Sequence, residues 1–181
     1  MSAITTAAIM ELRARTNAGM MDCKRALAEA QGDMEEAVRL LRLRGLAIQV
    51  KRAGKEAKEG VVHAAGSADG SVWALVEVNC ETDFVAKTDN FKAFAAEVAA
   101  RVLAGDEQVA ETMKDELAAL VASTGENVRI RRVARLVREG HGLITSYIHM
   151  GGKVGVLVHL SCEKAATMSD PLFAALAHDI A

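Results

Sequence analysis

The clearest alternation of apolar and polar positions in this chain runs through residues 71–80. Every second side chain is apolar, and this set comprises Val72, Ala74, Val76, Val78 and Cys80. A period of two is typical of a half-buried strand. Residues 60–66 predict a second strand, and Asp69 and Gly70 between the two are a hairpin turn signal. The pattern therefore predicts a β-hairpin.

Helical spacing dominates the first 45 residues, where we expect three short helices. The first ends near Asn17 and Gly19, and the second stops at Gly32. Asp33 caps the third, and Gly45 closes it. The positions expected to face inward are Ile9, Leu12, Cys23, Ala26, Leu27, Ala30, Ala37, Leu40 and Leu41. Such a small unit buries little surface, so we expect a module that binds a partner.

Residues 42–58 are strongly basic and are expected to form a linker. They contain six basic residues against one acid, Glu56, and Gly54 interrupts the pattern. A solvated linker is the simpler interpretation of this stretch, and an RNA contact is the alternative.

Two further helices follow the first hairpin. One begins at Thr88 or Asp89 and ends at Gly105, and the next ends at Gly125. Their inward positions are Phe91, Phe94, Ala95, Val98 and Val102 in the first, and Val109, Met113, Leu117, Leu120 and Val121 in the second.

The remaining segments predict strands and one last helix. Residues 127–138 favour a strand whose apolar face carries Val128, Ile130, Ala134 and Leu136. Residues 143–150 and 154–162 favour an antiparallel hairpin. Pro171 fits the first turn of a final helix. The fold class is therefore α+β, with a three-helix module and basic linker at 1–54. A core N-subdomain of strands, two helices and a strand spans 55–140, and a partial C-subdomain with a hairpin and the start of a helix spans 141–181.

Composition and charge narrow the range of partners. The chain has 22 basic and 24 acidic residues and a net charge of −2, so its overall charge does not favour nucleic acid or an anionic membrane. The three widely spaced cysteines, Cys23, Cys80 and Cys162, fall in apolar patterns and indicate buried, reduced thiols. We find no secretory signal and no apolar run of about 20 residues. A cytoplasmic protein is expected.

The sequence lacks the usual marks of an enzyme. Gly151, Gly152 and Lys153 lack the glycine spacing and the hydroxyl residue of a phosphate-binding loop. The five histidines show no metal-ligand spacing. Asp83 and His149 could form an acid–base pair in a small hydrolase, but no nucleophile motif accompanies them. We expect no catalytic residue, no metal and no cofactor.

The end of the strand at 71–80 is the strongest candidate site. It leads directly into Thr82, Asp83, Phe84 and Val85. Asp83 capping a turn and Phe84 packing back on the next helix would be a purely structural explanation. Alternatively, the strand presents an aromatic side chain and a negative charge to a partner.

A second candidate surface lies near the N-terminus. Adjacent Met20 and Met21 cannot both point inward, so we expect one in the core and one available to a partner, with Lys24 beside it.

Both candidate surfaces fall in motifs that resemble the elongation factor Ts family. NCETDFVAK at 79–87 and TNAGMMDCKRAL at 16–27 are the most specific, and GENVRIRR and SYIHMGGKVGVLV also fit. The resemblance implies a guanine nucleotide exchange factor for the GTPase elongation factor Tu, with no small-molecule substrate of its own. It also implies that the N-terminal helices form a ubiquitin-associated-like module that contacts the nucleotide domain of elongation factor Tu.

The resemblance assigns roles to particular positions. Thr82, Asp83, Phe84 and Val85 would enter beside the nucleotide site and dislodge Mg²⁺. Further contacts with the partner would come from Arg13, Met20, Met21, Lys24, Arg52, Thr124, Gly125 and His149. In this family the complex with the partner is either one-to-one or two-by-two, and the sequence leaves both open.

Three departures from the family pattern matter, and one of them is Thr124, which stands where an apolar residue is common. Asn17 stands where glycine is usual, and asparagine tolerates a left-handed backbone. The chain stops at Ala181, where family members continue through more of the second core subdomain, so we expect a truncated or naturally short form. A non-enzymatic scaffold or inactive paralogue is the alternative function.

Overall fold

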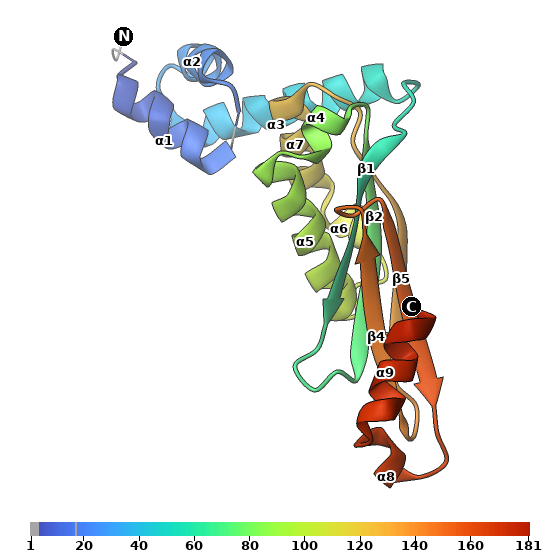
Figure 1. The fold of residues 1–181 in the computed structure, drawn as a ribbon. Helices are drawn as coiled ribbons and strands as arrows, with labels where there is room; N and C mark the ends of the chain where they lie inside the picture. Colours follow the sequence, from blue (N-terminus) through green and yellow to red (C-terminus); the bar gives the residue numbers. More distant parts are fainter. Residues whose placement is uncertain (1–3, 17) are drawn as a thin grey trace. The chain divides into compact units, whose positions relative to one another are not determined.

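The computed structural model of the protein describes residues 4–16 and 18–181. Helices precede and alternate with two small sheets, which confirms the α+β class (Figure 1). The predicted helix end at Asn17 lies outside the described residues. The chain forms two compact units. The first comprises the N-terminal segment up to Lys58, Cys80–Phe94 and Thr112–Arg129, and the second comprises Glu59–Asn79, Ala95–Glu111 and Ile130–Ala181.

The first unit begins with the three predicted helices. These are α1 (Thr6–Thr16), α2 (Met20–Glu29) and α3 (Met34–Arg52). Asp33 caps α3 as predicted, because its side chain accepts from the backbone N–H of Glu36 at 2.9 Å. The core of the three helices is built from Leu12, Ala18, Cys23, Ala26, Leu27, Ala30, Ala37 and Leu41. This set includes seven of the nine predicted inward positions, and Ile9 and Leu40 pack against it partly buried.

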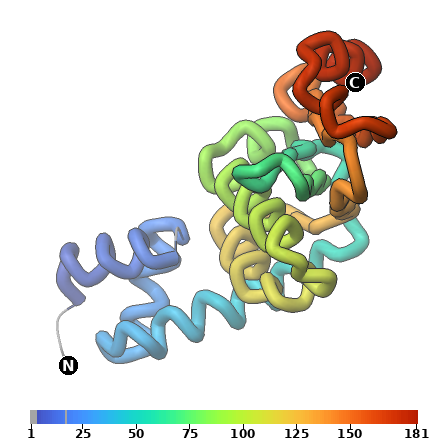
Figure 2. Tube along the Cα trace, turned by 90° about the horizontal axis from the view of Figure 1, so that it is seen from below, coloured from blue at the N-terminus to red at the C-terminus, as the bar shows by residue number. Residues whose placement is uncertain are grey.

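Helix α3 is longer than predicted. Gly45 does not close it, and the helix continues to Arg52 through the stretch expected to be a linker. Figure 2 shows α3 as a straight coil that extends well beyond α1 and α2. Gly45 is buried and lies against α7 (Lys114–Thr124). The glycine therefore serves close helix packing, and Lys51 and Arg52 after it stand on the last turn of the helix, whereas Lys55 and Lys58 lie beyond its end.

The second unit contains a three-stranded sheet in the order β1-β2-β3. Its strands are β1 (Glu59–Gly66), β2 (Val72–Cys80) and β3 (Arg129–Val137). The turn at Asp69 and Gly70 joins β1 and β2 as predicted, with Gly70 at φ +65°. The predicted inward face of β2 is confirmed at Ala74, Val76, Val78 and Cys80, which are all buried, whereas Val72 at the start of the strand is only half-buried.

The helices after β2 follow the prediction with one difference. Helix α5 (Asp89–Leu103) begins at Asp89, and its five predicted inward residues are buried. The next predicted helix is interrupted at Met113, which gives α6 (Val109–Thr112) and α7. Gly125 ends α7 in the left-handed conformation with φ +70°. Arg135 in β3 donates from Nε to the carbonyl of Leu103 at the end of α5, at 3.2 Å.

Strand β3 is less buried than its pattern predicts. Ile130 and Leu136 are half-buried, but Ala134 is exposed. This strand is at the edge of its sheet, and Ala134 lines an open hollow. The predicted apolar face of β3 is therefore only partly covered by the rest of the protein.

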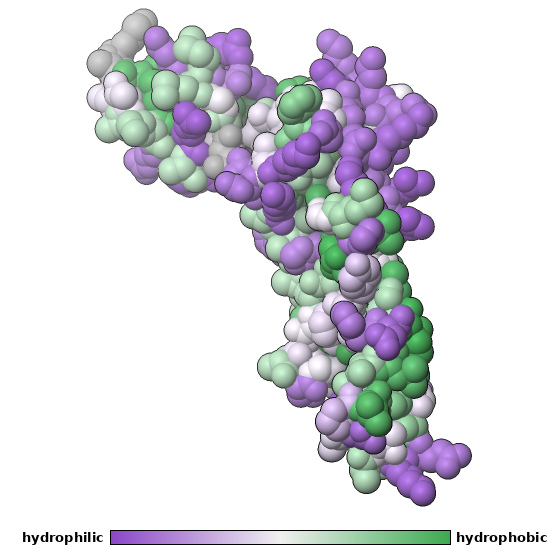
Figure 3. Space-filling view, viewed as in Figure 1, coloured by the Kyte–Doolittle hydropathy of each residue, from purple (hydrophilic) through white to green (hydrophobic). Residues whose placement is uncertain are grey.

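The last part of the second unit is the predicted antiparallel hairpin. Strands β4 (Gly142–His149) and β5 (Val154–Ser161) pair with Gly142 opposite Ser161 and His149 opposite Val154. A short helix α8 (Ala165–Met168), absent from the prediction, precedes α9 (Pro171–Ile180), which packs on the hairpin. Apolar side chains gather on the visible surface over this hairpin (Figure 3).

The cysteines follow the prediction in part. All three are thiols that form no disulfide, and Cys23 and Cys80 are buried. Cys162 is only half-buried, because it lies just beyond the last residue of β5.

Candidate functional site

The residues after β2 form a short helix, α4 (Asp83–Ala86), in place of the predicted turn. Thr82 caps it, since its Oγ1 accepts from the N–H of Val85 at 3.4 Å. Asp83 is not the cap, as the structural explanation had it, but lies in the first turn. There its carboxylate pairs with Lys87 Nζ at 2.6 Å.

Phe84 points away from the protein interior. Its side chain is 79% exposed, whereas Ala86 in the same helix is buried. The alternative in which Phe84 packs back on the following helix is therefore wrong. A large apolar side chain on the surface costs hydration free energy unless a partner covers it.

A hydrogen-bonded network of two glutamates surrounds the start of α4. Glu126 Oε2 accepts from the backbone N–H groups of Glu81 and Thr82, both at 3.0 Å, and Oε1 accepts from Thr82 Oγ1 at 2.6 Å. Glu81 Oε1 in turn accepts from the N–H of Asn127 at 2.7 Å. We call these two carboxylates the Glu81–Glu126 pair.

Arg52 extends this network to the end of α3. Its Nη1 donates to both carboxylate oxygens of Glu81, at 2.8 and 2.9 Å. The pKa of Glu81 is lowered, first by the N–H of Asn127 and then by Arg52, against the opposing effect of burial. The predicted partner contact Arg52 thus has an intramolecular role in this structure.

Thr124 and Gly125 lie beside the same network. Thr124 Oγ1 donates to the carbonyl of Leu120 at 2.8 Å and accepts from the N–H of Glu126 at 3.4 Å. The structure thereby joins three predicted sites, namely Arg52, residues 82–85 and residues 124–125, through side chains that sequence reasoning missed. Glu81 lies in the NCETDFVAK motif and Glu126 in the GENVRIRR motif. Their place in these motifs is what the sequence offers to indicate a functional role for the two glutamates.

The N-terminal candidate surface combines exposed methionines with exposed basic side chains. Met20 and Met21 in α2 are 50% and 64% exposed, so the expectation that one of them is in the core is wrong. The buried face of α2 is supplied instead by Cys23, Ala26 and Leu27. Lys24 is also exposed, as is Arg13 in α1. Met20 and Lys24, four residues apart, share one face of the helix.

His149 ends strand β4 in the second unit. Its Nδ1 lies 2.8 Å from the hydroxyl of Tyr147, and the two rings stack with centroids 5.7 Å apart. Asp83 pairs with Lys87, as described above. Each group thus has a partner close by in sequence, and this pairing within the described residues does not favour the hydrolase hypothesis.

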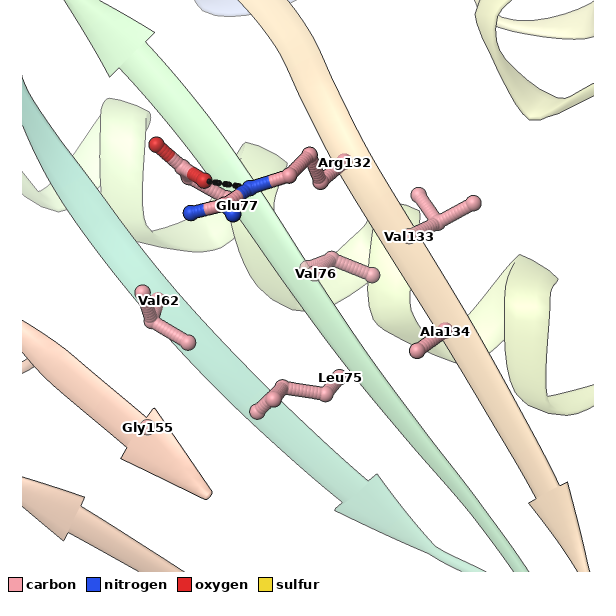
Figure 4. Close-up of a pocket in the computed structure, with 8 residues that line it drawn as sticks. All are labelled: Val62, Leu75, Val76, Glu77, Arg132, Val133, Ala134 and Gly155. Atoms are coloured by element: carbon pink, nitrogen blue, oxygen red, sulfur yellow. Dashed lines mark hydrogen bonds and ion pairs between the residues drawn. The ribbon is translucent and has the colours of Figure 1, made fainter. Parts of the chain in front are cut away.

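A hollow of about 310 Å³ opens on the three-stranded sheet (Figure 4). It is lined by Val62, Leu75, Val76, Glu77, Arg132, Val133, Ala134 and Gly155. Its one carboxylate, Glu77, is paired with Arg132 at 2.6 Å and with Arg131 at 3.6 Å. The lining residues include no nucleophile and no free acid–base pair, so this hollow has none of the groups that ordinary catalysis requires.

Two kinds of feature are absent from the described part of the chain. Residues 4–16 and 18–181 contain no cluster of three or more histidine, cysteine or acidic side chains that could bind a metal ion. Over the same residues, no helix is long and apolar enough to cross a membrane.

Comparison with known proteins identifies relatives. The family model described as elongation factor TS matches residues 81–181, which is more than half of the chain. Proteins named elongation factor Ts from Trichlorobacter lovleyi, Clostridium perfringens and Desulfovibrio desulfuricans are 47%, 46% and 45% identical to it. The alignments cover 99%, 98% and 100% of this chain, but only 61%, 60% and 65% of the relatives. The chain therefore spans less than two thirds of their length.

Proposed function

The chain belongs to the elongation factor Ts family, and we propose that it is a guanine nucleotide exchange factor that binds elongation factor Tu and promotes GDP release. The observation that carries this proposal is the exposure of Phe84 on a capped helix at the end of a strand. An aromatic side chain in this position offers a partner a large contact area at little cost in conformational entropy.

The proposed mechanism requires no covalent chemistry. Residues 82–85 enter beside the nucleotide site, Phe84 inserts between side chains of the GTPase, and the disturbance displaces Mg²⁺. The cation neutralises charge on the diphosphate, so its loss speeds the escape of GDP. The exchange factor and the nucleotide bind the same GTPase, and each lowers the affinity of the GTPase for the other by the same factor. GTP therefore displaces the exchange factor through this coupling.

The N-terminal surface has a different role in this proposal. Arg13, Met20, Met21 and Lys24 contact the nucleotide domain of the partner and supply affinity. Exposed methionines suit this role because the side chain is flexible and adapts to an apolar surface. His149 and residues 124–125 add contacts elsewhere.

The test is stopped-flow release of a fluorescent GDP from elongation factor Tu at fixed Mg²⁺. We expect this chain to accelerate release, and Phe84→Ala to abolish the acceleration while leaving the melting temperature unchanged. Leu172→Ala is the matched control, because Leu172 is 77% exposed in the second unit and belongs to no proposed contact. It should behave like the wild type.

Two results would contradict the proposal. If Phe84→Ala still accelerated GDP release, the aromatic side chain would have no role in exchange. Binding to elongation factor Tu without any acceleration by the wild type would favour a scaffold or an inactive paralogue.

A further inference from the structure

Helix α4 is too short to keep its shape without outside support. It has four residues, and isolated helices of fewer than about 12 residues are marginal in water. Phe84 is largely exposed, so packing of its own ring contributes little to its orientation. The direction in which Phe84 points is therefore determined by the backbone of residues 81–85.

That backbone is held by the Glu81–Glu126 pair. The carboxylate of Glu126 accepts three hydrogen bonds, two from successive backbone N–H groups and one from the Thr82 hydroxyl. Hydrogen bonds to an ionised carboxylate are roughly twice as strong as neutral ones. Because Thr82 gives its hydroxyl proton to Glu126, the lone pairs of Oγ1 remain for the N–H of Val85.

The carboxylate of Glu81 holds the segment that carries Glu126. Glu81 accepts from the N–H of Asn127, the residue after Glu126, and from Arg52 at the end of α3. Asn127 also donates from Nδ2 to the carbonyl of Lys55 at 2.7 Å. Both sides of the network are thus attached to α3 or to the residues just beyond it.

We propose that Glu126 is a positioning residue, which holds the first turn of α4 so that Phe84 is presented in one orientation before the partner arrives. This inference rests on the proposed exchange function. Misplacing this side chain slows the step that displaces GDP, because that step depends on where the ring of Phe84 lies.

Loss of the Glu126 side chain should lower the maximal rate of GDP release and leave the affinity for elongation factor Tu nearly unchanged. Replacing Glu126 with alanine should lower the maximal GDP release rate about tenfold, which corresponds to about 1.4 kcal/mol. The concentration of exchange factor at half-maximal rate should change less than about twofold, because the N-terminal contacts are intact. Glu126→Gln should restore most of the rate, since its amide oxygen can accept from the two N–H groups and its NH₂ can donate to Thr82.

The control is a glutamate with a simple surface ion pair. Glu97 in α5 is 49% exposed and pairs with Arg101 at 3.2 Å, so Glu97→Ala removes the same group without touching α4. It should keep the wild-type maximal rate. Should Glu126→Ala fail to fold, Thr82→Val tests the same network by removing only the hydroxyl, and it should show the same loss of maximal rate.

Amide hydrogen exchange of the free protein provides a readout that needs no partner. Glu126→Ala should speed exchange at the N–H groups of Thr82 and Val85 without speeding it in α5. A wild-type maximal rate in Glu126→Ala, or unchanged exchange at both amides, would overturn the inference. If the wild-type protein does not accelerate GDP release at all, the proposed function fails, and amide exchange alone decides whether Glu126 orders α4.

Discussion

Gly45 in α3 lies directly against the backbone of Ala118 in α7. A Cβ atom built on Gly45 would stand 2.1 Å from the carbonyl oxygen of Ala118 and 3.1 Å from the Cβ of Ala122. The ion pair between Arg42 and Asp115 joins the same two helices. Glycine is thus required here for the close approach of two helices, although it lies in a helix interior where it is intrinsically unfavourable.

This contact predicts that Gly45→Ala destabilises the protein. Alanine would improve helix propensity by up to about 1 kcal/mol. The clash of the alanine methyl group with the backbone of Ala118 should cost about 1–3 kcal/mol. The net change should therefore be a lower free energy of unfolding. Denaturant unfolding followed by circular dichroism measures it. Gly54→Ala is the control, because no atom lies within 4 Å of a Cβ there, and a loss of equal size in that variant would contradict the argument.

The N-terminal surface should affect affinity and not the maximal rate. Met21→Ala removes an exposed side chain from the proposed contact, and it should raise the half-saturating concentration about fivefold or more, as loss of about 1 kcal/mol of binding implies. Titration of GDP release at several concentrations of the variant measures both parameters. Met10→Ala, which alters a methionine in α1 that is 61% exposed, should leave both unchanged. A lower maximal rate for Met21→Ala would count against the division of roles.

The contribution that the turn between β1 and β2 makes to stability should depend on pH, because its hydrogen bonds are made to the carboxylate of Asp69. Hydrogen bonds from the hydroxyls of Ser67 and Ser71 and from the N–H of Ser71 lower the pKa of Asp69 to about 2. The unfolded value is about 3.9. The contribution of Asp69 to stability is therefore fully present above about pH 4 and is lost as the pH falls through about 2.

An NMR titration of the Asp69 carboxyl carbon measures this pKa. Ser67→Ala should raise it, because one of the donors to the carboxylate is removed. A carboxyl group that titrates near 4 in the wild-type protein would refute the prediction.

The three thiols should react at different rates. Cys23 is fully buried, and burial raises the pKa of its thiol, so little reactive thiolate forms. Cys80 is also buried, whereas Cys162 is half-buried beyond the end of β5. We expect a disulfide reagent to modify Cys162 first and the other two only when the protein opens. Cys162→Ser should remove the fast phase, and a fast phase that survives would show that one of the buried thiols is accessible.

Local patterns predicted most of the elements because local interactions form them. The alternation in β2 and the helical spacing in α5 come from side chains that all face one core, and both faces were predicted correctly. The Asp33 cap, the left-handed Gly125 and Pro171 at the start of α9 also follow from bonds within a few residues. These features depend on neighbours in sequence and are visible without a structure.

The sequence by itself determined the α+β class, the two motifs and the position of Phe84 after a buried strand. Only the tertiary structure decided that Gly45 is a packing contact and that Glu126 binds the backbone 45 residues earlier, at Glu81. A periodic pattern shows which face of an element is buried, but it does not specify which distant segment covers that face. Helix approach and long-range hydrogen bonds depend on that choice of partner, and they set the direction in which α4 presents Phe84.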